Sequence, residues 1–154
     1  MKVIFLDIDG VLNCDMYLIK HRCPGIGIDP EKMALIADIV RASGAKIVLT
    51  TSWRAHWSEN PNECDAMGRE INKAFAAHGL SVYSKTPHLY YNREQEILTW
   101  LDENPEVTRF VIIDDMWLKD DALDAYFIHT SGFRGGLCED EARDAIEILN
   151  VRFE

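Results

Sequence analysis

The feature of this sequence that most limits its fold is the alternation of short apolar runs with segments of helical periodicity. Five β-rich runs are expected to be strands, at residues 2–6, 46–50, 80–83, 109–113 and 125–129. Continuous apolar strands alternating with amphipathic helices are typical of a parallel sheet that is covered on both faces. We therefore predict an α/β fold of three layers, Rossmann-like, with a central, mainly parallel five-stranded sheet.

Four helices are expected between and after these strands. The first has Asp29 as its N-cap and Pro30 at its first position, and it ends at Gly44. The others are a helix with apolar positions from 67 to 75 that ends at Gly79, a helix that opens at Asn92, and a last helix at 139–149. The segment 13–28 has no clear period and is assigned no helix or strand.

Length and composition are those of one globular domain over residues 1–154. No apolar run approaches the roughly 20 residues that span a bilayer, and no signal peptide is recognised. The four cysteines are scattered, without a C-x-x-C pair, so we expect reduced thiols in a cytoplasmic protein.

The formal net charge of −10 disfavours an extended contact with nucleic acid, because phosphate contacts need a basic surface. A phosphorylated substrate held at one local site is compatible with this charge. Small molecules and nucleic-acid ends both remain open as such substrates. The sequence does not indicate an oligomeric state.

Three of the expected strands run directly into acidic or hydroxyl side chains. These are Asp7 and Asp9 after the first strand, Thr50, Thr51 and Ser52 after the second, and Asp114 and Asp115 after the fourth. Ligands of open parallel sheets bind beyond the carboxyl ends of the strands, where these groups meet. Four neighbouring carboxylates repel one another unless a cation compensates, and Mg²⁺ prefers carboxylate oxygens. We expect Mg²⁺ on Asp7, Asp9, Asp114 and Asp115.

These residue types suit phosphoryl transfer. Asp7 is the candidate nucleophile that accepts the phosphoryl group, and Asp9 the candidate general acid and base. Thr51 and the residues beside it are candidates for holding the phosphoryl oxygens. Arg93, at the start of a helix, is the candidate cation, with Lys85 as the alternative.

The motifs together resemble those of the haloacid dehalogenase (HAD) superfamily of phosphohydrolases. Residues 5–13 are similar to its first motif, residues 44–51 to its second, and Asp114 with Asp115 to its fourth. The third motif differs, because that superfamily usually has Lys where this chain has Arg93.

A closer resemblance is to the HAD domain found in Swiss Army knife RNA repair proteins, carried by residues 46–54 and by residues 136–139. The resemblance implies that Asp7 is both nucleophile and metal ligand, and that Asp9 offers its backbone carbonyl to the metal. It implies further that Asp114 is a ligand and that Asp115 supports or replaces one. The register of the second motif is open by one position, and counting from Gly44 favours Thr51, with Thr50 and Ser52 as its neighbours.

Some HAD proteins have an inserted cap domain, but the segment between the first motif and Asp29 is too short for one here, and the segment from Ser52 to Arg93 is already used by a helix and a strand. We expect an open site on a HAD-like domain without a folded cap. Trp53, Arg54, His56 and Trp57 either contact a substrate or pack their loop onto the domain.

The sequence therefore predicts a Mg²⁺-dependent phosphatase that forms an aspartyl-phosphate on Asp7. A non-catalytic or regulatory HAD-like module that binds metal or phosphate is the alternative. A phosphoacceptor signalling domain is a third interpretation, and the lifetime of the acyl-phosphate separates it from a phosphatase.

Overall fold

The computed structural model describes residues 1–90 and 92–151. Within this part of the chain, five strands form one sheet in the order β3-β2-β1-β4-β5, and every neighbouring pair is parallel. The strands are β1 (Lys2–Leu6), β2 (Lys46–Leu49), β3 (Val82–Lys85), β4 (Arg109–Asp114) and β5 (Phe127–His129). The predicted parallel α/β fold is confirmed.

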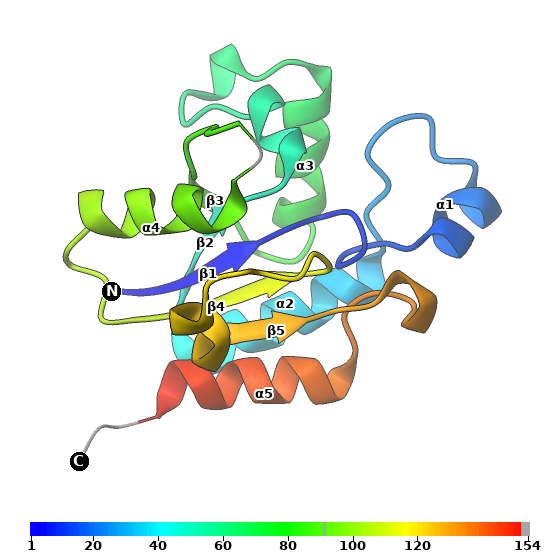
Figure 1. Cartoon of the computed structure of the whole chain (residues 1–154). Coiled ribbons are helices and arrows are strands. Elements are labelled where there is room, and N and C mark those ends of the chain that lie inside the picture. The colour runs from blue at the N-terminus through cyan, green and yellow to red at the C-terminus, as the bar shows by residue number, and fades with distance from the viewer. Residues whose placement is uncertain (91, 152–154) are drawn as a thin grey trace.

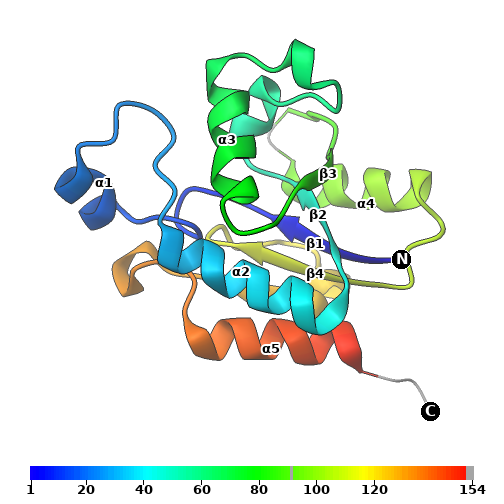
Figure 2. The same ribbon diagram turned by 180° about the vertical axis from the view of Figure 1, so that it is seen from behind.

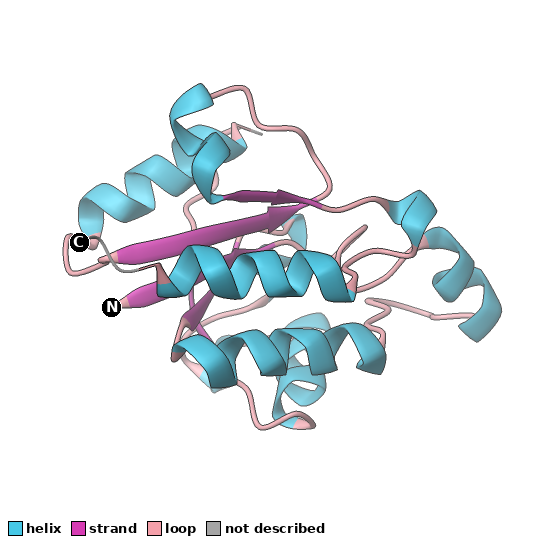
Figure 3. Cartoon of the chain, turned by 90° about the horizontal axis from the view of Figure 1, so that it is seen from below, coloured by secondary structure: helices cyan, strands magenta, loops and turns pink. Residues whose placement is uncertain are grey.

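Helices cover both faces of the sheet and complete the three layers (Figures 1 and 3). One face carries α2 (Pro30–Ser43), α3 (Ala66–Ala76) and α5 (Glu139–Asn150), and the other carries α4 (Arg93–Glu103). Figure 2 shows α2 and α5 side by side beneath the strands. This arrangement leaves the carboxyl ends of the strands uncovered by the long helices.

Residues of β1 alternate between the two cores that these layers form. Ile4 and Leu6 pack with the apolar residues of α2, α3 and α5, whereas Val3 and Phe5 pack on the side of α4. The Phe5 ring meets the Trp100 ring edge to face, with 5.5 Å between centroids. Because β1 is buried on both faces, its sequence is a continuous apolar run rather than an alternating one.

The caps that the sequence predicts are present. The Asp29 carboxylate accepts a hydrogen bond from the Glu31 N–H at 2.9 Å, and Gly44 ends α2 in the left-handed conformation with a φ of 71°. The Asn92 side chain accepts from the Gln95 N–H at 3.1 Å at the start of α4. Local hydrogen bonds of this kind fix where each helix begins and ends.

The structure corrects the boundaries of four strands, and the fourth ends one residue later than expected, at Asp114. The third strand was expected at 80–83 but forms at Val82–Lys85, because the Leu80 N–H donates to the Phe75 carbonyl and so closes α3. The second strand ends one residue earlier than expected, at Leu49. The fifth begins two residues later, because Asp121–Tyr126 forms a 3₁₀ helix before it.

A short helix, α1 (Asp15–His21), lies in the segment to which the sequence assigned no element. None of its residues is buried, and its apolar residues, 16–19, are consecutive rather than spaced at helical intervals, so a periodicity argument does not detect it. Figure 1 shows α1 standing apart from the layers, beyond the end of the sheet to which the strands point. Between β1 and α2 the described chain forms only this helix, so no folded cap domain is present there, as predicted.

Two further expectations concern the chain as a whole. All four cysteines are free thiols, and only Cys64 is buried. Within the described residues, no helix combines the length and the apolar character needed to cross a membrane.

Candidate active site

Three polar side chains lie in one row across the sheet. The parallel register pairs Leu6 with Leu49 on one side and with Ile113 on the other, so Thr50 and Asp114 stand at the same level as Asp7. The ladder continues through this level, because the Asp7 N–H donates to the Ile113 carbonyl at 3.1 Å and the Thr50 N–H to the Leu6 carbonyl at 3.0 Å. The row crosses the boundary between β1 and β4, the point where the strand order reverses and ligands of such sheets bind.

Carboxylates gather at this point. Asp7 and Asp114 are buried, Asp115 is half-buried, and one oxygen atom from each lies within 4.8 Å of the others. Burial raises the pKa of Asp7 well above its ordinary value, and the nearby Asp114 raises it further. Burial also raises the pKa of Asp114. The site therefore holds more negative charge than its own cation neutralises.

That cation is Arg93, at the first position of α4. Its Nη1 donates to the Asp114 carboxylate and, at 3.3 Å, to the Thr50 hydroxyl oxygen, and it lies 3.8 Å from Asp7 Oδ2. The alternative, Lys85, donates instead to the carbonyls of Arg54 and Trp57, at 3.1 and 2.6 Å. Of the two candidates, the structure brings Arg93 to the carboxylates.

The three hydroxyl residues after β2 have different surroundings. The Thr50 hydroxyl contacts Arg93, as above, and is fully buried. The Thr51 hydroxyl accepts from the Trp53 N–H at 3.3 Å and caps the 3₁₀ helix Ser52–His56. Ser52 is exposed and lines a small cavity of about 60 Å³ beside Arg93. Thr50, rather than Thr51, thus shares the level of Asp7 and the contact with Arg93.

The Asp9 side chain is exposed and does not join the group of three carboxylates. Its Oδ2 accepts from the Trp53 indole N–H at 2.8 Å, and its Oδ1 accepts from the Asn13 amide at 3.0 Å. Asn13 is itself buried, and its amide also donates to the Gly27 carbonyl at 2.6 Å. Sequence reasoning missed Asn13 and Trp53 as partners of Asp9. The folding of the loops brings these side chains to Asp9, and no local pattern in the sequence indicates the contacts.

Gly10 allows the loop after β1 to approach Asp115. Its φ of 79° is in the left-handed region, and a Cβ at this position would lie 2.2 Å from Asp115 Oδ2. On its other side, the Asp115 carbonyl oxygen lies 2.9 Å from His129 Nε2. The Gly10 backbone of the first motif therefore lies directly against the Asp115 carboxylate of the fourth motif.

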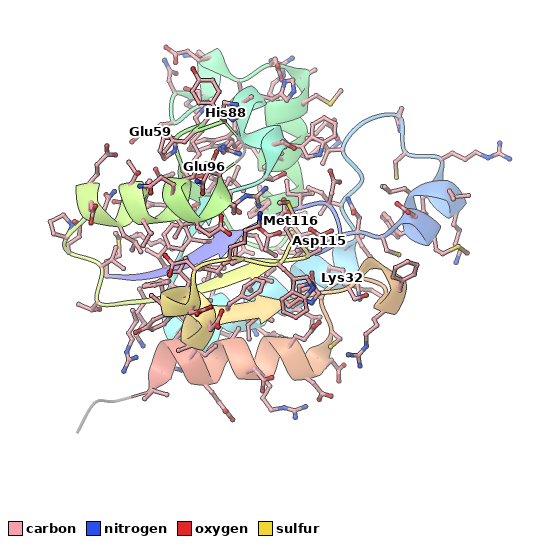
Figure 4. The ribbon with its side chains drawn as sticks, in the orientation of Figure 1. Lys32, Glu59, His88, Glu96, Asp115 and Met116 are labelled. Carbon is pink, nitrogen blue, oxygen red and sulfur yellow. The ribbon has the colours of Figure 1, made fainter. Side chains whose placement is uncertain are left out.

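A buried ion pair stands behind Arg93. Arg54 and Glu96 are 5% and 2% exposed, and Arg54 Nη2 lies 3.0 Å from Glu96 Oε1. Arg54 Nη1 also donates to the carbonyls of Thr50 and Thr51, at 2.9 and 2.8 Å. Figure 4 shows Glu96 and His88 on the side of α4, with Asp115 and Met116 on the loop that leaves β4.

The Arg54 side chain therefore packs its loop onto the domain, as one of the two interpretations above expects. Trp57 is likewise buried, with its indole N–H donated to Asn72 Oδ1 at 2.9 Å. Sequence reasoning missed Glu96. The signal was its position three residues after Arg93, which places both side chains on one side of α4.

Comparison with known families decides the relationship. Residues 3–142 match the family described as the HAD domain in Swiss Army Knife RNA repair proteins. The chain belongs to this family. The match spans all five strands and both acidic motifs, and it supports a HAD-like phosphohydrolase at the level of the superfamily. Neither the curated proteins nor the solved structures gave a match.

The donor set of this HAD domain fits a hard divalent cation. Asp7, Asp114 and Asp115 offer carboxylate oxygens, which Mg²⁺ prefers, and no sulfur or imidazole belongs to the group of three. Burial raises the pKa of Asp7 and of Asp114, and a cation bound between them would favour their ionised forms. The expected ligand Asp9 offers no side-chain oxygen to this group, which leaves its backbone carbonyl as the ligand that the family resemblance implies.

Proposed function

We propose that this protein is a Mg²⁺-dependent phosphomonoester hydrolase that works through an aspartyl-phosphate on Asp7. The observation that carries the proposal is the juxtaposition of Asp7 with Asp114, Thr50 and Arg93 at the switch point of the sheet. A nucleophilic carboxylate, a cation and a hydroxyl donor are the groups that phosphoryl transfer to an aspartate requires.

In the first step, Asp7 attacks phosphorus. Its Oδ1 accepts from the Ile8 N–H at 2.8 Å, so Oδ2, which lies 3.8 Å from Arg93, is the attacking oxygen. The new bond joins Oδ2 to phosphorus, and the bond from phosphorus to the ester oxygen breaks. Asp9 gives its proton to that leaving oxygen.

In the second step, water releases the phosphate. Asp9, now ionised, takes a proton from the attacking water, whose oxygen forms a bond to phosphorus while the bond between Asp7 Oδ2 and phosphorus breaks, and inorganic phosphate leaves. Hydrogen bonds from Trp53 and Asn13 hold the Asp9 carboxylate in one orientation for both transfers.

Two residues stabilise the phosphoryl group while it moves. The Arg93 guanidinium and the Thr50 hydroxyl lie beside Asp7, where charge develops on the phosphoryl oxygens. Mg²⁺ held by Asp7, Asp114 and Asp115 supplies further neutralisation of that charge when it is bound.

The substrate class is an accessible phosphomonoester, with nucleotides and nucleic-acid ends to be tested beside small molecules. The uncovered strand ends support this openness. An RNA-repair association belongs to the family description, and for this chain it is a reason to include phosphorylated RNA ends in the test.

The test is phosphate release from an aryl phosphate with Mg²⁺ or with EDTA. Uncatalysed hydrolysis of phosphate monoesters is so slow that weak catalysis is readily detected. We expect release that depends on Mg²⁺, is lost in Asp7→Asn, and is unchanged in Asp144→Asn, which alters an exposed carboxylate of α5. A folded protein that binds Mg²⁺ but hydrolyses neither aryl phosphates nor phosphorylated oligonucleotides or nucleotides would instead support the non-catalytic module.

A further inference from the structure

A groove of about 810 Å³ opens beside Asp9 at the end of the sheet. Asp9 and Asp115 border it on the side of the catalytic carboxylates, and α1 forms a wall through Met16. Phe133, from the segment that leads to α5, forms another wall, together with Trp53. We call this space the α1 groove.

The α1 groove has apolar side chains that nothing in the described chain covers. Phe133 is fully exposed and Met16 is 75% exposed. The helix that carries Met16 has no buried residue, so α1 adds nothing to either core. Exposed apolar side chains that converge on one space from distant parts of a chain mark a binding site.

The charge of the α1 groove limits what binds there. Asp9, Asp15 and Asp115 line it, and no Lys, Arg or His is among its lining residues in the described chain. An occupant with further phosphate or carboxylate groups would meet these carboxylates and no cationic side chain of the lining. An uncharged aromatic group meets Trp53, Phe133 and Met16 instead, side chains that pack well against flat rings.

The role of the α1 groove follows from its position beside Asp9, and this step rests on the proposed function above. Asp9 is the residue that protonates the leaving oxygen, so the group attached to that oxygen extends from Asp9. We propose that the α1 groove binds the leaving group, and that the preferred substrate is a monoester of an uncharged alcohol that bears an aromatic ring. A polyanionic leaving group, such as a long 3′-phosphorylated oligonucleotide, is disfavoured.

The first experiment compares substrates on the wild-type protein with Mg²⁺. We expect kcat/KM to be higher for 2-naphthyl phosphate than for phenyl phosphate, because their leaving groups have similar acidity and differ in apolar ring area, and higher for phenyl phosphate than for 4-carboxyphenyl phosphate. Equal values within both pairs, or a better reaction with a 3′-phosphorylated oligonucleotide than with 2-naphthyl phosphate, would overturn the assignment. Failure to hydrolyse any of these substrates would count against the proposed function instead.

The second experiment measures binding without turnover. In an Asp7→Asn background with Mg²⁺, 2-naphthyl phosphate is titrated calorimetrically into variants with Met16→Ser, Phe133→Ser or Ile19→Ser. Ile19 is the matched control, because it is 71% exposed on the same helix and does not line the groove. We expect the first two variants to weaken binding by about 3- to 10-fold and the control to leave it unchanged. Equal binding in all three would overturn the assignment even if the catalytic mechanism holds.

Discussion

Oε1 of Glu96 lies 3.0 Å from Nη2 of Arg54, and the same carboxylate is within 4.0 Å of Arg93 Nε. The side chains of Arg54 and Glu96 are almost fully buried, and the side chain of Arg93 is 12% exposed. Glu96 also accepts from the Leu89 N–H at 2.9 Å. Arg93 is thus held between the Glu96 carboxylate on one side and the carboxylates of the candidate site on the other.

Glu96→Gln should destabilise the protein by about 3 kcal/mol, because removing one partner of a buried ion pair leaves the Arg54 charge uncompensated. Urea unfolding measures the free energy change. Glu103→Gln, an exposed position of α4, is the control and should change stability by less than about 0.5 kcal/mol. Similar effects of the two substitutions would show that the Glu96–Arg54 pair contributes little.

Arg93→Ala should lower kcat by about 10²- to 10³-fold, because it removes a preorganised donor at the developing charge. Lys85→Met should leave kcat within about 3-fold, since Lys85 donates to backbone carbonyls and not to the site. Steady-state kinetics on one aryl phosphate gives kcat for both variants and for the wild type. The reverse order of effects would assign the phosphate-binding role to Lys85.

Asp7→Asn should stabilise the metal-free protein at neutral pH. The folded-state pKa of Asp7 is raised above the unfolded value of about 3.9, so its stabilising contribution is complete below that value and is lost as pH rises through the folded pKa. The Tm difference between Asp7→Asn and wild type should therefore grow with pH. Thermal unfolding in EDTA from pH 4 to pH 8 tests this, and a difference that shrinks with pH would contradict the burial of this carboxylate.

Mg²⁺ should raise the Tm of the wild type and do so far less in Asp114→Asn. Binding to the folded state alone stabilises it by about 2.7 kcal/mol at 100 times the Kd. Asp9→Asn should keep this Mg²⁺ effect while losing activity, because its side chain lies outside the three-carboxylate group. Equal loss of the Mg²⁺ effect in both variants would place the Asp9 carboxylate on the metal.

Gly10→Ala should reduce activity by at least about 10-fold. A Cβ there meets the Asp115 carboxylate at 2.2 Å and is strained at a φ of 79°, so the two acidic motifs must move apart. Gly79→Ala, at a similar φ of 70° but with nothing within 4 Å, is the matched control. It should lower stability without lowering kcat, and a parallel loss of kcat in both would contradict the role of the Gly10–Asp115 contact.

The sequence by itself determined the layers of the fold and the edge at which the polar groups meet. The apolar strands that lead to Asp7 and Asp114 follow from local periodicity, and parallel strands necessarily present their carboxyl ends on one side. The caps of α2 and α4 were predictable for the same reason, because they depend on neighbouring residues.

Only the tertiary structure decided which neighbours each polar group has. The register that sets Thr50 beside Asp7 and the burial of Glu96 against Arg54 depend on packing between segments distant in sequence. The hydrogen bond from Trp53 to Asp9 joins two loops that are 44 residues apart. α1 was missed because none of its residues belongs to a core, and the groove beside it is lined by α1 together with Phe133, which is distant in sequence. Such contacts arise from chain topology, and no local pattern in the sequence encodes them.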